Sequence, residues 1–121
     1  MTPQPTFMAT FRDVAQQFGE LIAAGNYPAA FTLLTPEAQA TSTPESLKTA
    51  IATMTAQAPG GIQEVQVMEE GIVEDWPEKQ PGDVASVYVA LAGVGFAEAV
   101  TVTVVQRNGN LLIRHLEWGR P

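Results

Sequence analysis

A change in hydrophobic periodicity near Pro59 divides this chain into a helical first part and a stranded second part. In the first part, apolar residues such as Phe11, Val14 and Phe18 recur at steps of three and four, which is the spacing of one face of a helix. From Ile62 onward apolar and polar residues tend to alternate, which is typical of strands with one buried face. Helices that precede the strands, instead of alternating with them, predict an α+β fold.

Residues that start and stop helices predict three of them. The first covers residues 7–22 and ends at Gly25 and Asn26, which both tolerate the left-handed conformation of a C-cap. Asn26 also begins a short second helix, because its side chain can accept from the free backbone donors of the first turn. The third begins at Thr43-Pro44-Glu45, which places a hydroxyl, a proline and an acid where a helix start favours them. Residues 35–41, between the second and third helices, are predicted to form a turn, which can include one helical loop of its own.

The second part predicts an antiparallel sheet of about four strands that packs against these helices. The segments are residues 62–73 with an interruption, 84–91, 96–106 and 111–118. Asn108-Gly109 joins the last two as a tight hairpin, because both central residues of a type I′ turn need positive φ. Residues 1–6, which hold two prolines, are predicted to be a flexible lead-in. Residues 7–121 then form a single domain of ordinary size.

Composition excludes several classes of partner and site. Thirteen acidic against six basic residues leave a formal charge of −7, which disfavours nucleic acids and anionic membrane surfaces. The chain has no cysteine and one histidine, so we predict no metal site, and no cofactor motif is present. No apolar stretch approaches the roughly 20 residues that span a bilayer, and the N-terminus does not resemble a signal peptide. We therefore expect a soluble, cytoplasmic protein.

The segment FGELIAAGNYPAAFTLLTPEAQA resembles the first two helices of many NTF2-like proteins, a superfamily also described as a cystatin-like cone. The resemblance implies a curved sheet wrapped against the helices, with a pocket for a small apolar ligand at the open end of the cone. It also implies dimerisation through the outer surface of the sheet. The superfamily includes isomerases, dehydratases, polyketide cyclases, transport factors and non-catalytic binding domains, so the fold alone does not identify an activity.

The hairpin turn predicts the register of the last two strands, and this register brings a candidate catalytic group together. Counting back from Asn108-Gly109 places Val102 opposite His115 and Val100 opposite Glu117. This register predicts that Glu98, His115 and Glu117 gather on the interior face, where a carboxylate beside the only histidine would be an acid–base pair. A small enzyme acting on a hydrophobic carbonyl compound is therefore one interpretation. The alternative is that the histidine is structural and the glutamates lie at the solvated rim of the sheet.

Aromatic residues are the candidate lining of the expected cone pocket. The tyrosine hydroxyls would donate to a ligand carbonyl, and the phenylalanine rings would set the apolar volume. These candidate ligand-binding residues are Tyr27, Tyr88, Phe18, Phe31 and Phe96. The aspartate pattern of the superfamily's steroid isomerases and the His-Asp pairs of its dehydratases are missing, so we favour a non-catalytic binding domain.

The other face of the sheet is predicted to be an interface. An apolar outer face of this kind marks a protein contact, and a homodimer is the expected partner. The candidate interface residues are Leu112, Arg114, Leu116, Trp118, Thr101 and Thr103. Trp76, in the proline-flanked loop EDWPEKQPGD, and the acidic charge leave a third interpretation open. In that interpretation the chain is a binding module for a basic protein.

Overall fold

The computed structural model describes residues 10–56 and 60–119. The predicted lead-in at residues 1–6 lies outside the described residues. The helical part holds four α-helices: α1 (Phe11–Ala23), α2 (Tyr27–Phe31), α3 (Pro36–Gln39) and α4 (Pro44–Met54). Four strands follow: β1 (Glu64–Val67), β2 (Asp83–Gly93), β3 (Phe96–Arg107) and β4 (Asn110–Trp118). A short 3-10 helix, η1 (Glu69–Gly71), lies between β1 and β2. The α+β class is confirmed.

Caps explain where the helices begin. The side chains of Asn26 and Thr43 accept hydrogen bonds from the backbone N–H groups of Ala29 and Ser46, as the sequence predicts. The described residues hold one helix more than the three expected, because Thr35 caps the four-residue helix α3 by accepting from the N–H of Ala38. The sequence predicted a turn here, with room for one helical loop, and not a separate helix.

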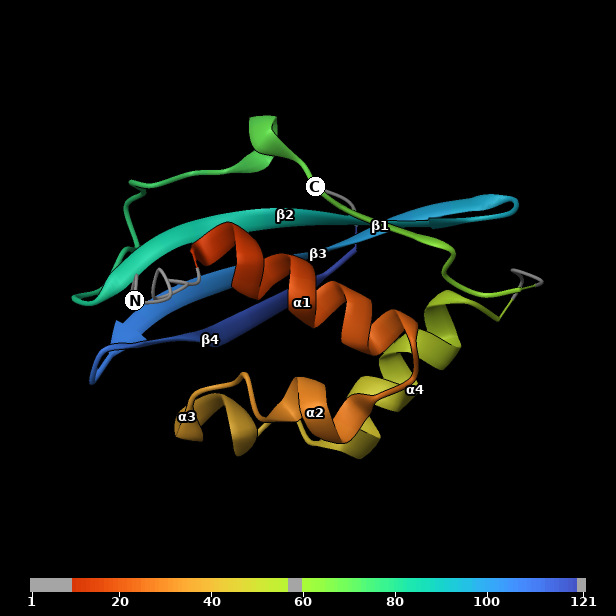
Figure 1. The fold of residues 1–121 in the computed structure, drawn as a ribbon, viewed down its shortest axis with the longest axis horizontal. Coiled ribbons are helices and arrows are strands. Elements are labelled where there is room, and N and C mark those ends of the chain that lie inside the picture. The colour runs from red at the N-terminus through yellow and green to blue at the C-terminus, as the bar shows by residue number, and fades with distance from the viewer. Residues whose placement is uncertain (1–9, 57–59, 120–121) are drawn as a thin grey trace, which may run out of the picture.

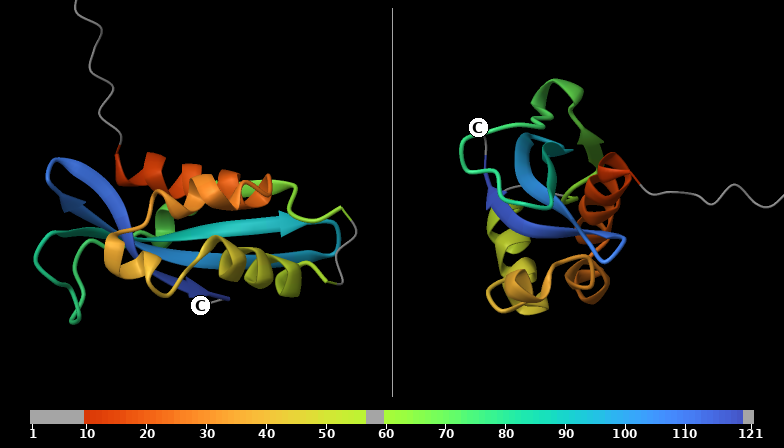
Figure 2. Two further views of the ribbon diagram at one scale, coloured as in Figure 1. Left: turned by 90° about the horizontal axis from the view of Figure 1, so that it is seen from below. Right: turned by 90° about the vertical axis from the view of Figure 1, so that its left-hand side faces the viewer.

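The strands form one antiparallel sheet in the order β1-β2-β3-β4, and the helices lie together on one of its faces (Figure 1). The hairpin between β3 and β4 has φ values of 52° at Asn108 and 80° at Gly109, which confirms the predicted positive-φ turn. Segment 68–82 returns on the far side of the sheet from the helices (Figure 2). We call the face opposite the helices the open face. Among the described residues, no helix is long and apolar enough to cross a membrane.

The space between the helices and the sheet is filled by side chains. Its largest members are fully buried and come from α1, the segment between α2 and α3, α4 and every strand except β1; examples are Phe18, Ile22, Leu47, Leu91, Val102 and Ile113. Burial of apolar surface on this scale is the main force that holds helices on a sheet. The core therefore occupies the position where the sequence led us to expect a cone pocket.

Two residues of α1 fit the helix to the edge strand β1. The Gln16 side chain donates to the carbonyl of Val65 (3.0 Å) and accepts from the N–H of Val67 (3.3 Å). It therefore satisfies backbone groups of the edge strand β1 that have no neighbouring strand to pair with. Gly19 lets the helix approach closely, because a Cβ atom at this position would lie 2.5 Å from Val65 Cγ1. The edge of the sheet is thus closed from within the domain.

A β-bulge in β4 changes which side chains face the helices. Val104 pairs with Ile113 as predicted, but Thr103 pairs with His115, so Arg114 is an extra residue between the two pairs. Beyond the bulge, Val102 pairs with Leu116 and Val100 pairs with Trp118. The predicted pairs of Val102 with His115 and of Val100 with Glu117 are therefore wrong by one residue.

The bulge also reverses the predicted faces, because a shift of one residue turns every later side chain to the other side. Leu116 and Trp118 pack against the core, so their prediction as interface residues on the outer face is wrong. His115 and Glu117 lie on the open face beside Thr103 and Thr101, so their prediction as interior residues is also wrong.

Candidate functional site

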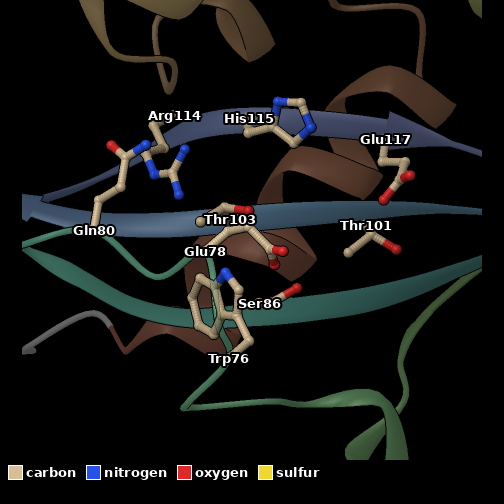
Figure 3. Close-up of a pocket in the computed structure, with 9 residues that line it drawn as sticks. All are labelled: Trp76, Glu78, Gln80, Ser86, Thr101, Thr103, Arg114, His115 and Glu117. Atoms are coloured by element: carbon tan, nitrogen blue, oxygen red, sulfur yellow. The ribbon is translucent and has the colours of Figure 1, made fainter.

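A hollow of about 340 Å³ lies on the open face, between the strands and the loop that precedes β2 (Figure 3). This volume is at the lower end of the range for small-ligand sites. The loop contributes three residues, β2 one, and β3 and β4 the rest. The nine lining residues are Trp76, Glu78, Gln80, Ser86, Thr101, Thr103, Arg114, His115 and Glu117.

Strand register places the polar floor of this hollow. Thr103 lies between Ser86 on β2 and His115 on β4, and Thr101 is paired with Glu117. Side chains that are paired across strands share a face, so the bulge at Arg114 is what brings His115 and Glu117 beside the hydroxyls. Trp76 reaches in from the loop on the opposite side (Figure 3).

Thr103 is the most buried residue of the floor. Thr103 retains only 7% of its exposure, and its side chain makes no hydrogen bond to another of the described residues. The described residues also contain no fully enclosed side-chain polar atom that lacks a partner, so the Thr103 hydroxyl is reached from the hollow that it lines. A hydroxyl that opens into a hollow and has no protein partner offers a hydrogen bond to a ligand or to water.

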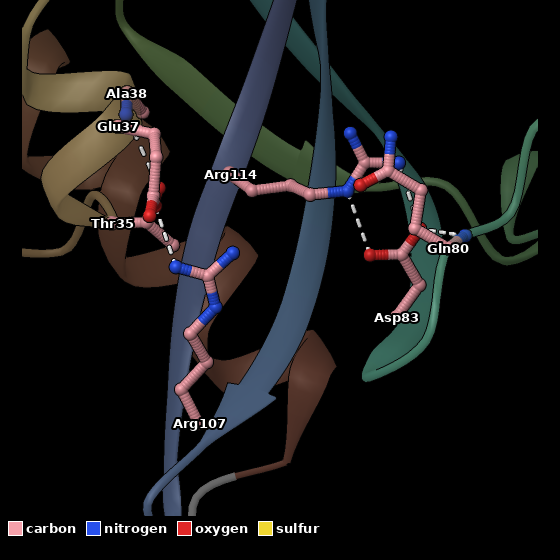
Figure 4. A network of polar contacts seen from close by, with 7 residues as sticks. All are labelled: Thr35, Glu37, Ala38, Gln80, Asp83, Arg107 and Arg114. Carbon is pink, nitrogen blue, oxygen red and sulfur yellow. Dashed lines mark hydrogen bonds and ion pairs between the residues drawn. The ribbon is translucent and has the colours of Figure 1, made fainter.

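An ion pair beneath the loop fixes one end of the hollow (Figure 4). Arg114 contacts both carboxylate oxygens of Asp83, with Nε–Oδ1 and Nη2–Oδ2 distances of 2.7 Å. The Asp83 side chain is fully buried and that of Arg114 is 18% exposed. The N–H of Gln80 donates to Asp83 Oδ2 at 2.8 Å, so the network joins the bulge in β4, the start of β2 and the end of the loop.

The same contacts set the charge state of the pair. The hydrogen bond from Arg114 holds the pKa of Asp83 below its usual range, and the bond from the Gln80 N–H acts in the same direction, against the effect of burial. The pKa of Arg114 is raised in turn by its bond to Asp83. Both groups are therefore charged at neutral pH, and together they add no net charge to the hollow.

A second, exposed ion pair, between Arg107 and Glu37, lies by the β3–β4 hairpin (Figure 4).

The loop is braced by its own contacts. The N–H of Lys79 donates to the carbonyl of Trp76 at 3.0 Å, and its ammonium donates to the carbonyl of Glu74 at 2.7 Å. Lys79 Nζ also lies 5.9 Å from the centroid of the Trp76 ring, within the distance of a cation–π interaction. These contacts hold the indole in place above the strands.

The structure separates the three predicted catalytic residues. His115 and Glu117 line the hollow, and both are exposed. Glu98 pairs with Leu91 and lies on the face toward the helices, on the other side of the sheet from His115. The expected convergence of Glu98 with the histidine is therefore wrong.

The predicted ligand-binding aromatics also lie apart. Phe18 is fully buried in the core, and Tyr27 and Phe31 are partly buried against it. Tyr88 is on the open face, where Gly71 approaches its Cβ, and Phe96 lies beside Gly93 at the β2–β3 hairpin. They do not line one cavity. Of the predicted interface residues, Thr101, Thr103, Leu112 and Arg114 are on the open face.

In the described ranges, no group of three or more histidine, cysteine, aspartate or glutamate side chains is placed to hold a metal ion. Glu78, Gln80 and Ser86 also line the hollow, and the sequence alone did not mark them as site residues.

No protein-family model, curated protein or solved structure matches this chain. The function is therefore argued from the geometry of the hollow.

Proposed function

We propose that this chain is a non-catalytic domain of the NTF2-like kind that binds its ligand on the open face of the sheet, in the hollow beneath Trp76. The observation that carries the proposal is the hydroxyl of Thr103, a residue that is 7% exposed. This hydroxyl opens into the hollow and has no hydrogen-bond partner among the described residues. A tryptophan above and convergent polar groups below are the usual components of a small-ligand site.

The location differs from the one that the resemblance implies. A cone pocket would lie between the helices and the sheet. That space is occupied by the core, in which Phe18 of α1 and Leu91 and Val102 of the sheet are fully buried. Adding a ligand to a close-packed core would require these side chains to move. The open face needs no such change, so we place the ligand site there. The absence of cysteine accords with a cytoplasmic location, which is part of the same proposal.

A screen of small polar and apolar fragments against the ¹⁵N-labelled protein tests this placement. We expect the shifted NMR signals to cluster at the Trp76 indole N–H and at the amides of Ser86 and Thr103. Shifts that cluster instead on the methyl groups of Leu91 and Val102 would place the ligand in the interior and refute the proposal.

A second candidate function is homodimerisation through the same face. Four alanines lie together on the open face of the β2–β3 hairpin; they are Ala90, Ala92, Ala97 and Ala99. Small side chains allow two sheets to approach closely, and Ala97 is exposed. We expect the native chain to sediment as a dimer and Ala97→Arg as a monomer; a native monomer at all concentrations would remove this candidate.

A further inference from the structure

We propose that the occupant of the hollow is the side chain of a lysine or arginine from a basic partner protein. This inference rests on the proposed function and specifies the ligand of that same site. The charge of the hollow, the chemistry of its floor and the tryptophan above it support this inference.

The hollow carries an excess of negative charge. Arg114 and Asp83 neutralise each other through two hydrogen bonds. Glu78 and Glu117 line the hollow, and neither forms an ion pair with another described residue. Among the lining residues, His115 can contribute at most one further positive charge, so the lining keeps at least one uncompensated carboxylate. The ammonium of Lys79 lies beside the Trp76 ring but outside this lining. A cation is the ligand that such a site attracts.

The floor and the roof both suit a cation with several N–H donors. The hydroxyls of Ser86, Thr101 and Thr103 can each accept a hydrogen bond, and an ammonium or guanidinium group has donors only. The Trp76 ring offers the aromatic face that cations prefer. Its environment already attracts one, since Lys79 Nζ lies 5.9 Å from the ring centroid. Lys79 does not line the hollow, so its ammonium leaves that space free.

The charge of the whole chain favours a protein as the source of this cation. The formal charge of −7 speeds the approach of a basic surface over distances that a single carboxylate does not reach. The hollow opens to solvent between the strands and the loop that holds Trp76, so a side chain that projects from a folded partner can enter it. A partner that presents a lysine or arginine beside small or polar residues fits both features.

Single-residue probes test the inference directly. Trp118→Phe leaves Trp76 as the only tryptophan, and its fluorescence is then titrated with the Nα-acetyl methylamides of arginine, lysine and norleucine. We expect the cationic probes to bind with a Kd on the order of 1 mM, in keeping with their size. We expect norleucine, which keeps the alkyl chain without the charge, to bind about tenfold more weakly.

Charge-removing variants locate the effect. Glu78→Gln and Glu117→Gln are each expected to weaken arginine binding about threefold. Glu70→Gln is the matched control, because it removes an exposed carboxylate of η1 that does not line the hollow. It should leave binding unchanged in the same low-salt buffer. Circular dichroism of each variant checks that the fold is retained.

The outcomes separate this inference from the proposed function. Equal binding of norleucine and arginine, or equal weakening by all three glutamate variants, would overturn the cation but leave the hollow as a ligand site. If neither the probes nor any fragment perturbs Trp76, both the inference and the proposed function are overturned.

Discussion

Removal of the Arg114 guanidinium tests how the open face is organised. In Arg114→Met the carboxylate of Asp83 stays fully buried and keeps only the hydrogen bond from Gln80. Leaving a buried charge without its partner costs about 3–5 kcal/mol. Arg114 is 18% exposed, so water can reach part of the vacated space, and we expect the lower end of that range. A loss of about 3 kcal/mol corresponds to a fall in Tm of about 12 °C for a chain of this length.

A double-mutant cycle separates the ion pair from general damage to the fold. Asp83→Asn removes the buried charge and keeps an oxygen for the Gln80 N–H. We therefore expect the double variant Arg114→Met/Asp83→Asn to be more stable than the sum of the single variants predicts, by about 2 kcal/mol. The free energy of unfolding is measured by urea denaturation, followed by circular dichroism.

Arg107→Met is the matched control, because it removes an arginine from an exposed ion pair in which Glu37 retains 70% of its side-chain exposure. We expect its Tm to stay close to that of the native chain. If the two substitutions at Arg114 and Asp83 are additive within about 0.5 kcal/mol, the pair does not act as a unit. The account of the network beneath the loop would then be refuted.

Three further perturbations have defined outcomes. Gln16→Ala removes both hydrogen bonds to the edge strand at Val65 and Val67; we expect a loss of about 1–2 kcal/mol and faster aggregation, and an unchanged urea midpoint would contradict it. Gly19→Ala forces Val65 away from α1, so it should lower Tm even though alanine favours helices by about 1 kcal/mol; a higher Tm would show that the strand moves freely. The depressed pKa of Asp83 stabilises the fold at pH values above about 4 and is lost as the pH falls through the lowered value. The difference in stability between the native chain and Asp83→Asn should therefore shrink from pH 6 to pH 3; a constant difference would be the contrary result.

The element order could be predicted because its signals are local. A side chain that caps a helix acts within four residues, as Asn26 and Thr43 do, and an Asn-Gly pair needs no distant partner to favour positive φ. Helix α3 was expected only as one helical loop within a turn, because four residues are too few to show a periodicity. Its cap at Thr35 was the available signal, since a threonine followed by a proline also begins α4.

The face assignment failed at one residue. From the turn, strict alternation predicts that His115 and Glu117 face inward, and it holds as far as Ile113. An alternative reading keeps Ile113, Leu116 and Trp118 on one apolar face, which requires an extra residue between the first two. Ile113 and Leu116 are three residues apart, whereas regular alternation puts residues on one face at even spacings. This odd spacing was the signal for the bulge, because burying the apolar side chains outweighs strict alternation along the strand.

The hollow itself could not be derived from the sequence. It depends on segment 74–82 passing over the open face, and on a buried ion pair between residues 31 positions apart. No local pattern links Asp83 to Arg114, because the contact crosses the intervening strand β3. The sequence marked Trp76 as a candidate lid or contact residue, with a plain loop anchor as the alternative. Glu78 and Ser86 join it in the hollow only through this long-range arrangement.

The position of a bound cationic probe shows whether the ligand lies in the hollow beneath Trp76 or in the core. We would measure intermolecular nuclear Overhauser effects between Nα-acetyl-arginine methylamide and the ¹³C-labelled native chain. The account predicts contacts from the arginine methylene groups to the Trp76 ring and the Thr103 methyl group. Contacts to the methyl groups of Leu91 or Val102, in the core between the helices and the sheet, would contradict it.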